Sequence, residues 1–383
     1  MAQERTYQYD TLRLRLYPTE RQKELFEKTF GCCRYIWNRM LADQQKFYLE
    51  TDAHFIPTPA KYKGEAPFLK EVDNQALIQE NVRLTQAFRN FFKNPEHFQP
   101  PKFKRKKDGR NSYTVCNHVF ASGPTVYLTA DGIRLTKAGV VPARIHRRPE
   151  SGWELRRASI QKTPAGKYYC YVVYRHPVKT PEPVVPTEET TVGLKLSARH
   201  FYVTDQGLRA DPPRWVQQSA NRLNSMQKRL ARMEPGSRNY QDQVQRLRRL
   251  HEHIAKQRID YLHQESRRIT NAWDAVCVRD DDLTALNRLT HQTNLTDSSF
   301  GTFLQLLDYK LQRQGKSLLR VDRYEPTTRR CHCCGAIRQA AEPATRWCCP
   351  DCGALLDREE NAAINIKRSG LELVPSIVQP FGR

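Results

Sequence analysis

The sequence predicts a multi-domain protein that mixes helices and strands. Residues 113–174 contain short alternating runs separated by turn residues, which is typical of a small β-barrel. Three prolines then indicate a linker, at Pro181, Pro183 and Pro186. Beyond the linker, strands and helices alternate as in a mixed α/β domain. A length of 383 residues, at about 150 residues per domain, allows two to three domains.

The first half begins with a predicted strand. Leu12, Leu14 and Leu16 alternate with Arg13 and Arg15, which indicates a half-buried strand with an arginine-bearing outer face.

Two helices follow this strand. Thr19 and Gln22 have the spacing of a capping box and predict the start of the first helix. The second carries apolar residues at helical steps over 77–91, and it should end at Asn94 because a residue before proline avoids the helical region.

The sequence of the second half of the chain predicts secondary-structure elements in the order strand, strand, helix pair, strand, helix, strand. We expect two strands over 190–203, two basic helices over 220–270 that are interrupted at 235–237, a strand over 275–278, a helix over 300–311 and a strand over 317–322.

The charge of the chain indicates a polyanionic partner. Its 63 Lys and Arg exceed 41 Asp and Glu by 22, and nucleic acid is the expected partner. A solubility role for this charge is the alternative. The sequence contains no transmembrane run or signal peptide, so we expect a cytoplasmic protein associated with the bacterial nucleoid and not with a membrane.

Six of the 11 cysteines fall within 22 residues and predict a metal site. Cys331 and Cys334 form one C-x-x-C knuckle, and Cys349 and Cys352 form the other. Four thiolates at this spacing favour structural Zn²⁺ in a closed tetrahedral site. Buried or redox-active cysteines are the alternative, and either of the adjacent cysteines at 333 and 348 could replace a ligand.

A basic run from Lys102 to Arg110 contains six basic residues and one acid. Such a run is either a solvated loop or a contact to a nucleic-acid backbone. Interleaved Phe103 and nearby Tyr113 favour the contact. The candidate nucleic-acid-binding residues are Arg13, Arg15, Arg34, Lys102, Lys104, Arg105, Lys106 and Lys107.

Several motifs follow one another along the chain. They are Leu16-Tyr-Pro-Thr19, Phe30-Gly-Cys-Cys-Arg34, Lys70-Glu-Val-Asp-Asn-Gln-Ala-Leu77, Ala87-Phe-Arg-Asn-Phe-Phe92, His251-Glu-His-Ile-Ala-Lys-Gln-Arg258, Asp322-Arg-Tyr-Glu-Pro-Thr327, Cys349-Pro-Asp-Cys-Gly353 and Asp357-Arg-Glu-Glu-Asn-Ala-Ala-Ile-Asn-Ile366. In this order they resemble the TnpB family of RNA-guided nucleases from IS200/IS605 transposons, which are relatives of type V CRISPR effectors.

The resemblance implies four modules. An oligonucleotide-binding-like wedge β-barrel would comprise residues 1–17 and 105–180, with a helical recognition domain over 18–104 inserted into it. A RuvC-like domain with an RNase H fold would comprise 188–328 and 354–383. The zinc module would be inserted into that domain over 329–353.

The resemblance also shows where this chain departs from a nuclease. The family holds two catalytic divalent metals with an Asp on a first strand, a Glu after a later strand and a third Asp. Lys195 takes the place of the first acid and Arg279 that of the second, whereas Asp357 matches the third. Glu359 stands where the family usually has a further Asp.

This replacement predicts a degenerate centre without catalytic Mg²⁺. Three carboxylates carry −3, whereas Lys195, Arg279 and Asp357 together carry +1, and Asp357 could bridge internally to either cation. Asp281 would lie on the same strand face as Arg279, but about 6–7 Å further along, too far to ligate the metal without remodelling.

The expected function is therefore RNA-guided binding of DNA without cleavage, as in the TnpB-derived TldR repressors. The partners would be a guide RNA and double-stranded DNA beside a short target-adjacent motif, and occupancy of a promoter would block RNA polymerase. The alternatives are an active nuclease that uses Asp357, Glu359 and relocated acids such as Asp281, and a transposon remnant or protein–RNA module without a DNA target.

Overall fold

The computed structural model describes residues 6–109, 111–121, 123–197, 199–210, 214–283, 299–339 and 345–374. The chain forms two compact units, an N-terminal unit up to Lys179 and a C-terminal unit from Thr180. The boundary adjoins the proline-rich stretch predicted as a linker. Among the described residues, no helix combines the length and the apolar character that crossing a membrane requires.

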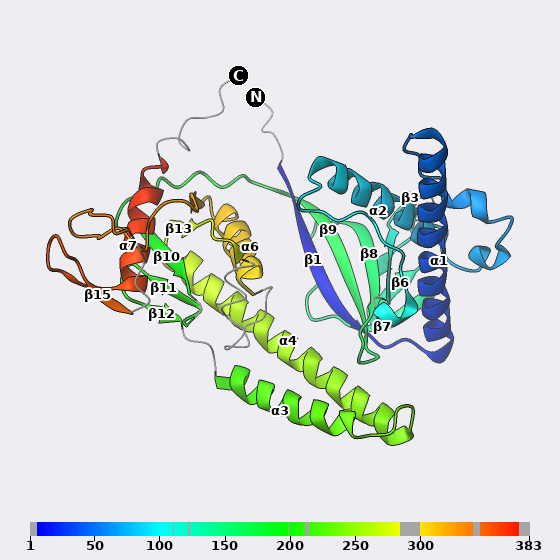
Figure 1. Ribbon diagram of the computed structural model, residues 1–383. Coiled ribbons are helices and arrows are strands. Elements are labelled where there is room, and N and C mark those ends of the chain that lie inside the picture. Colours follow the sequence, from blue (N-terminus) through cyan, green and yellow to red (C-terminus); the bar gives the residue numbers. More distant parts are fainter. Residues whose placement is uncertain are drawn as a thin grey trace, which may run out of the picture. The chain divides into compact units, whose positions relative to one another are not determined.

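The N-terminal unit is built on a seven-stranded sheet (Figure 1). Its strand order is β2-β8-β9-β1-β7-β6-β5. The strands are β1 (Thr6–Leu16), β2 (Asn111–Cys116), β5 (Tyr127–Leu128), β6 (Gly132–Leu135), β7 (Gly139–Arg144), β8 (Glu154–Lys162) and β9 (Tyr168–Val178), and a separate hairpin comprises β3 (Val119–Phe120) and β4 (Gly123–Pro124).

The helices of this unit lie between β1 and β2 in the sequence. They are α1 (Glu20–Thr51), α2 (Asn74–Lys93) and three 3₁₀ turns, Pro59–Tyr62, Pro67–Lys70 and Lys106–Asp108. The predicted capping box is present, because Gln22 N–H donates to Thr19 Oγ1 and Thr19 N–H donates to Gln22 Oε1. The helix α2 ends at Lys93 with Asn94 as its cap, as predicted.

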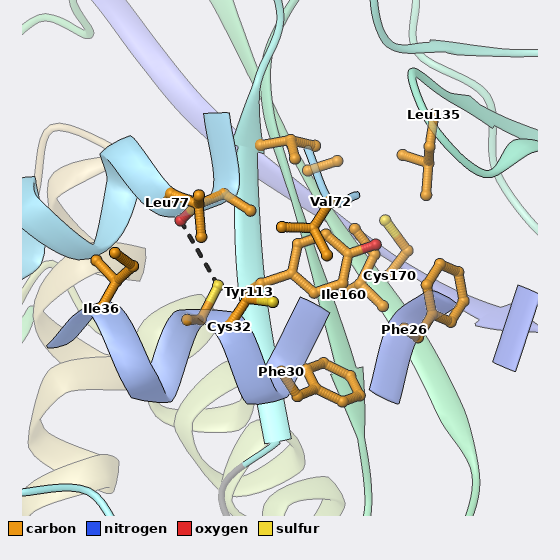
Figure 2. Close-up of a cluster of buried hydrophobic side chains, with 14 of the residues drawn as sticks. Phe26, Phe30, Cys32, Ile36, Val72, Leu77, Tyr113, Leu135, Ile160 and Cys170 are labelled. Carbon is orange, nitrogen blue, oxygen red and sulfur yellow. Dashed lines mark hydrogen bonds between the residues drawn. The ribbon is translucent and has the colours of Figure 1, made fainter. Parts of the chain in front are cut away.

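The inner face of the sheet packs on α1 and α2. Phe26 and Phe30 of α1 lie 6.0 and 5.6 Å from the ring of Tyr113, measured between centroids. Figure 2 shows these rings together with the β8 and β9 side chains Ile160 and Cys170. The alternating leucines of β1 join the same core, which confirms the predicted half-buried strand.

The C-terminal unit is a mixed α/β fold around a five-stranded sheet with the order β12-β11-β10-β13-β14. The strands are β10 (Thr191–Leu196), β11 (Tyr202–Thr204), β12 (Arg209–Ala210), β13 (Ala275–Arg279) and β14 (Ser317–Val321), with β15 (Arg346–Cys348) and β16 (Leu355–Asp357) in a separate pair. The helices are α3 (Arg214–Ala231), α4 (Arg238–Ala272), α6 (Ser299–Gln312) and α7 (Arg358–Leu371).

These elements follow the predicted order. The two basic helices are α3 and α4, which form a hairpin interrupted at the predicted turn, where Gly236 has φ of 87° (Figure 1). The predicted strand over 275–278 and helix over 300–311 are β13 and α6.

Two helical layers cover opposite faces of this sheet. Val192, Leu194 and Val278 share a buried cluster with α4 and α6. The neighbouring positions face α7, because a Cβ added at Gly193 would lie 2.0 Å from the Ala363 carbonyl oxygen. The intervening residues of β10 and β13 are therefore directed to the α7 side.

Candidate nuclease centre and metal site

Lys195 and Arg279 lie side by side on the α7 face of the sheet. The strands β10 and β13 are parallel, with Gly193 opposite Cys277 and Leu194 opposite Val278. One step further along each strand places Lys195 beside Arg279, on the same face as Gly193. The fold thus brings together the two basic residues that the family resemblance aligns with acidic metal-ligand positions.

Asp281 joins the two cations. Its Oδ2 accepts from Lys195 Nζ at 2.9 Å, and its Oδ1 accepts from Arg279 Nε at 2.6 Å. The three side chains are only 13%, 17% and 12% exposed, in the order Lys195, Arg279 and Asp281. We call these three residues the Lys–Asp–Arg bridge.

The position of Asp281 differs from the sequence expectation. An extended strand would carry it away from Arg279, but β13 ends at Arg279 and the Asp281 N–H donates to the Arg279 carbonyl at 2.8 Å. This turn brings the Asp281 carboxylate back onto the guanidinium. The sequence predicts the end of the strand at 278, but it does not indicate that the chain then turns back so that Asp281 meets Arg279.

One further hydrogen bond holds the bridge, from Arg279 Nη1 to Thr327 Oγ1 at 3.1 Å. Beside the bridge, Ser197 Oγ donates to Glu359 Oε1 at the start of α7. Burial lowers the pKa of the Lys195 ammonium below its usual value of 10.5, whereas the Asp281 carboxylate opposes that shift. Glu359 also acts electrostatically on Lys195, so a second acid contributes to the charge balance here.

Asp357 has different partners from those expected. It caps α7, since its Oδ1 accepts from the N–H groups of Glu359 and Glu360 at 3.0 and 3.1 Å. Its Oδ2 accepts from Arg209 Nη2 at 2.9 Å. The expectation that Asp357 would bridge Lys195 or Arg279 is therefore wrong: Asp281 makes that bridge. Arg209 is not among the residues predicted for this site, because nothing in the sequence around it indicates that it pairs with Asp357.

The charges of this cluster balance without a metal. Lys195 and Arg279 carry +2, and Asp281 and Glu359 carry −2, so the group is neutral. Two-metal catalysis instead needs carboxylate oxygens that are free to coordinate. In the described part of the chain, each carboxylate of Asp281 and Asp357 already accepts hydrogen bonds from a cationic side chain.

The four predicted knuckle cysteines come together in the C-terminal unit. The Sγ atoms of Cys331, Cys334, Cys349 and Cys352 all lie within 4.8 Å of one another. The Cys331–Cys352 and Cys334–Cys349 Sγ distances are 3.7 and 3.6 Å. Metal–sulfur bonds of about 2.3 Å in a tetrahedron give sulfur separations of about 3.8 Å, so this cluster fits a tetrahedral metal ion. Among the described residues, the cysteines at 333 and 348 stand outside the cluster.

The N-terminal unit contains a pocket of about 720 Å³ where several predicted nucleic-acid contacts meet. Its lining residues are Phe30, Cys33, Arg34, Trp37, Glu80, Arg83, Lys102, Phe103, Lys104, Arg105, Asp108 and Ser112. Lys106 and Lys107 lie beyond it, in the 3₁₀ turn. Arg110, which ends the basic run, lies outside the described residues.

Lys104 has an internal partner in this pocket. Its Nζ lies 2.6 Å from Glu80 Oε2 and 3.7 Å from the centre of the Trp37 ring. Glu80 is 1% exposed and also pairs with Arg83 at 2.7 Å. Burial lowers the pKa of the Lys104 ammonium, with Glu80 opposing the shift. Lys104 therefore neutralises a buried acid, a role that its position within a basic run did not indicate.

Arg13 and Arg15 lie on the face of the sheet opposite the core. The Arg13 guanidinium carbon is 4.1 Å from the Tyr169 ring centre, and that of Arg15 is 5.1 Å from the same centre. Arg34 donates to Asn111 Oδ1 at 3.2 Å. These arginines thus belong to two separate surfaces of the N-terminal unit, the outer sheet face and the pocket.

Three family models match this chain. The OrfB_IS605 model ("Probable transposase") matches residues 171–288, and the Cas12f1-like TNB domain matches 300–366. A helix-turn-helix model of OrfB_IS605 matches residues 8–52, which form β1 and α1. The Lys–Asp–Arg bridge falls within the first of these matches, and the cysteine cluster falls within the second.

Relatives match over nearly the whole chain. A Streptomyces pristinaespiralis protein named "Putative RNA-guided DNA endonuclease" is 28% identical over 93% of this chain and 88% of its own length. Escherichia coli K12 InsQ, with the same description, is 25% identical over 94% of this chain and 91% of its own length. TnpB-like protein L79 of Acanthamoeba polyphaga mimivirus is 27% identical over 33% of this chain and 25% of its own length. This chain is TnpB-like. The resemblance stated from its motifs is thereby confirmed.

The fold resembles that of a solved effector complex. The Cas12f1 chain in a cryo-EM structure with guide RNA and target DNA superposes with a TM-score of 0.59 at 9% identity, over 94% of this chain and 99% of that chain. At this identity the likeness concerns the fold alone. It supports the predicted multi-domain α/β architecture of this TnpB-like chain.

Proposed function

We propose that this TnpB-like chain is an RNA-guided, sequence-specific DNA-binding protein that does not cut DNA. The observation that carries the proposal is the Lys–Asp–Arg bridge. A nuclease of this kind needs open carboxylates for two divalent metals. Here two cations occupy ligand positions, and Asp281 is held by both of them.

RNA guidance is the part of the proposal that relatives support. Relatives that span nearly the whole chain are named as RNA-guided endonucleases, and the excess of 22 positive charges suits a protein that holds RNA and a heteroduplex through phosphates. A binder that stays on a promoter would exclude RNA polymerase sterically, so repression is the expected outcome. We assign the wedge, recognition and RuvC-like roles to three of the four modules on the basis of the same family resemblance.

We further propose that the cysteine cluster holds structural Zn²⁺. Four thiolates with sulfur separations of 3.6–3.7 Å suit a closed, four-coordinate zinc site. When bound, the ion supplies folding free energy to the segment and takes no part in phosphodiester chemistry.

The first experiment identifies the RNA. The full chain is expressed with its native flanking sequence, purified, and its bound RNA is sequenced. We expect one RNA species whose 3′ segment matches a chromosomal site, and DNA carrying that site should shift in a gel. Bound RNA without such a segment, or no shift of matched DNA, would contradict RNA guidance.

The second experiment tests cleavage. The protein–RNA complex is incubated with a plasmid that carries the matched site, in Mg²⁺ and then in Mn²⁺. We expect occupancy without nicking, together with repression of a reporter placed behind the site. Guide-dependent nicking would instead show an active nuclease, and its loss in Asp357→Ala or Asp281→Ala, at a temperature where calorimetry shows that variant folded, would identify the relocated acids.

A further inference from the structure

The outer face of the N-terminal sheet carries alternating tyrosines and arginines. The strands β1 and β9 pair antiparallel over their full length, from Thr6 opposite Val178 to Leu16 opposite Tyr168. The leucines of β1 point into the core, so the intervening residues point outward. We define the Arg–Tyr face by the outward residues Tyr7, Tyr9, Arg13, Arg15, Tyr169, Tyr171 and Arg175, with Tyr17 just beyond β1.

The arginines of this face lie on tyrosine rings. Arg13 sits 4.1 Å from the Tyr169 ring centre and 5.8 Å from that of Tyr171. Arg175 sits 4.5 Å from the ring centre of Tyr7. A guanidinium held against a ring is oriented before any ligand arrives, so it loses less conformational freedom when it binds a phosphate or a base.

Several rings on this face remain open to solvent. Tyr9 is 58% exposed and Tyr7 is 49% exposed on β1, and Tyr17 is 54% exposed. Exposed rings at successive outward positions are platforms on which nucleobases can stack.

The charge of the face is strongly positive. Arg144 lies opposite Arg15 on β7, and Arg157 lies opposite Val173 on β8, so both extend the face. With Arg13, Arg15 and Arg175 these two make five arginines. Of these five, only Arg175 has an acidic partner among the described residues, Glu154 at 2.6 Å.

The spacing of the face selects between single-stranded and duplex nucleic acid. Outward residues repeat about every 6.6 Å along a strand. Stacked nucleotides in a duplex strand repeat at about 3.4 Å. Successive tyrosines therefore suit bases that are splayed apart, which only a single strand can offer.

We infer that the Arg–Tyr face binds a single-stranded segment of the guide RNA, with bases on its exposed tyrosines and phosphates on the arginines. The inference rests on the proposed function, because the RNA is the strand that the protein holds before and after DNA arrives. DNA is single-stranded only after a target opens.

The test uses the full chain, stripped of RNA, and labelled unstructured RNA of about 12 nucleotides. Fluorescence anisotropy compares this probe with DNA of the same sequence and with blunt RNA duplex. We expect Tyr9→Ala combined with Tyr171→Ala to weaken single-stranded RNA binding about 10- to 100-fold and to leave its salt dependence unchanged, because no phosphate contact is lost. Arg13→Lys keeps the charge and loses the planar stack, so it should weaken binding as well.

The matched control is Tyr324→Ala, which removes a ring that is 84% exposed in the C-terminal unit. It should bind RNA like the wild type, and thermal unfolding should show every variant folded. The inference is overturned if the tyrosine variant binds single-stranded RNA normally, if it loses duplex binding equally, or if only DNA binding falls. Guide RNA and matched DNA bound normally by that variant would leave the proposed function intact. The wild-type protein could instead copurify without guide RNA while its binding of the RNA probe still depends on the tyrosines. That result would refute the proposed function and leave the RNA-binding role of the face standing.

Discussion

Replacing Asp281 by asparagine should destabilise the C-terminal unit sharply. The substitution keeps the shape of the side chain and removes the charge that Lys195 and Arg279 share. Both cations are less than one-fifth exposed, so water cannot screen them fully. Breaking a buried ion pair costs about 3–5 kcal/mol, because the remaining charge stays buried without a partner. At about 2–4 °C per kcal/mol for a unit of this size, the melting temperature should fall by about 6–20 °C.

The neighbouring residue provides a matched control for this substitution. Asp280 is 52% exposed and pairs at the surface with Arg320 and Arg323, at 3.9 and 3.5 Å. Asp280→Asn makes the same chemical change one residue earlier and should cost less than about 1 kcal/mol. Differential scanning calorimetry of the full chain would compare the two variants. Equal losses for both would refute the argument that Asp281 neutralises a buried pair of cations.

The pH dependence adds a second readout. Burial lowers the pKa of Lys195 in the folded chain below its ordinary 10.5, which applies to the unfolded chain. At a pH between the folded and the unfolded pKa, the unfolded chain therefore binds more protons than the folded chain. Stability from this group therefore rises with pH in that window. Removing Asp281 removes a group that raises this pKa, so the deficit of Asp281→Asn should shrink as the pH is raised from neutral towards 10.

Three further predictions concern other parts of the chain. Metal analysis should find one zinc ion per chain, which Cys349→Ser loses and Cys333→Ser keeps, because only the first belongs to the cluster. Gly193→Ala should lower the free energy of unfolding, measured in urea, by about 1–3 kcal/mol, because the new Cβ would meet a carbonyl oxygen of α7. Gly31→Ala should raise it by about 0.5–1 kcal/mol, because Gly31 lies in a helix with open space around it. Lys104→Met should lower the urea midpoint by an amount equivalent to about 1–3 kcal/mol, because a buried carboxylate loses one of its two cationic partners.

Much of the fold could be predicted from local patterns. Alternating leucines marked β1, a capping box marked the start of α1, and a proline marked the end of α2. Each of these signals acts within a few residues of the feature it controls. The two-residue strands β4 and β12 pair with the neighbouring strands β3 and β11, but a run of two residues is too short to show the alternation by which a strand is predicted.

The same distinction separates the parts of the candidate sites. The four members of the cysteine cluster lie in two C-x-x-C motifs, so the spacing of cysteines along the sequence was enough to identify them. Asp357 pairs with Arg209, 148 residues away, and Lys104 pairs with Glu80, 24 residues away. No local sequence pattern predicts either pair. Sequence placed Lys195 and Arg279 at the site through the family motifs, but only the turn after β13 revealed which acid joins them.

The pairing of Lys195 and Arg279 explains how the sheet can hold two buried cations and remain stable. Substituting buried carboxylates by lysine and arginine leaves charges that would each cost several kcal/mol if unpaired. Here Asp281 lies within hydrogen-bonding distance of both, and Arg209 takes the remaining motif acid, Asp357. The sheet can thus keep its packing against α7 with no metal at the centre. The loss of cutting that we propose would therefore leave intact the scaffold that would hold RNA and DNA, so the proposed binding function and the cation-filled centre are compatible in one stable fold.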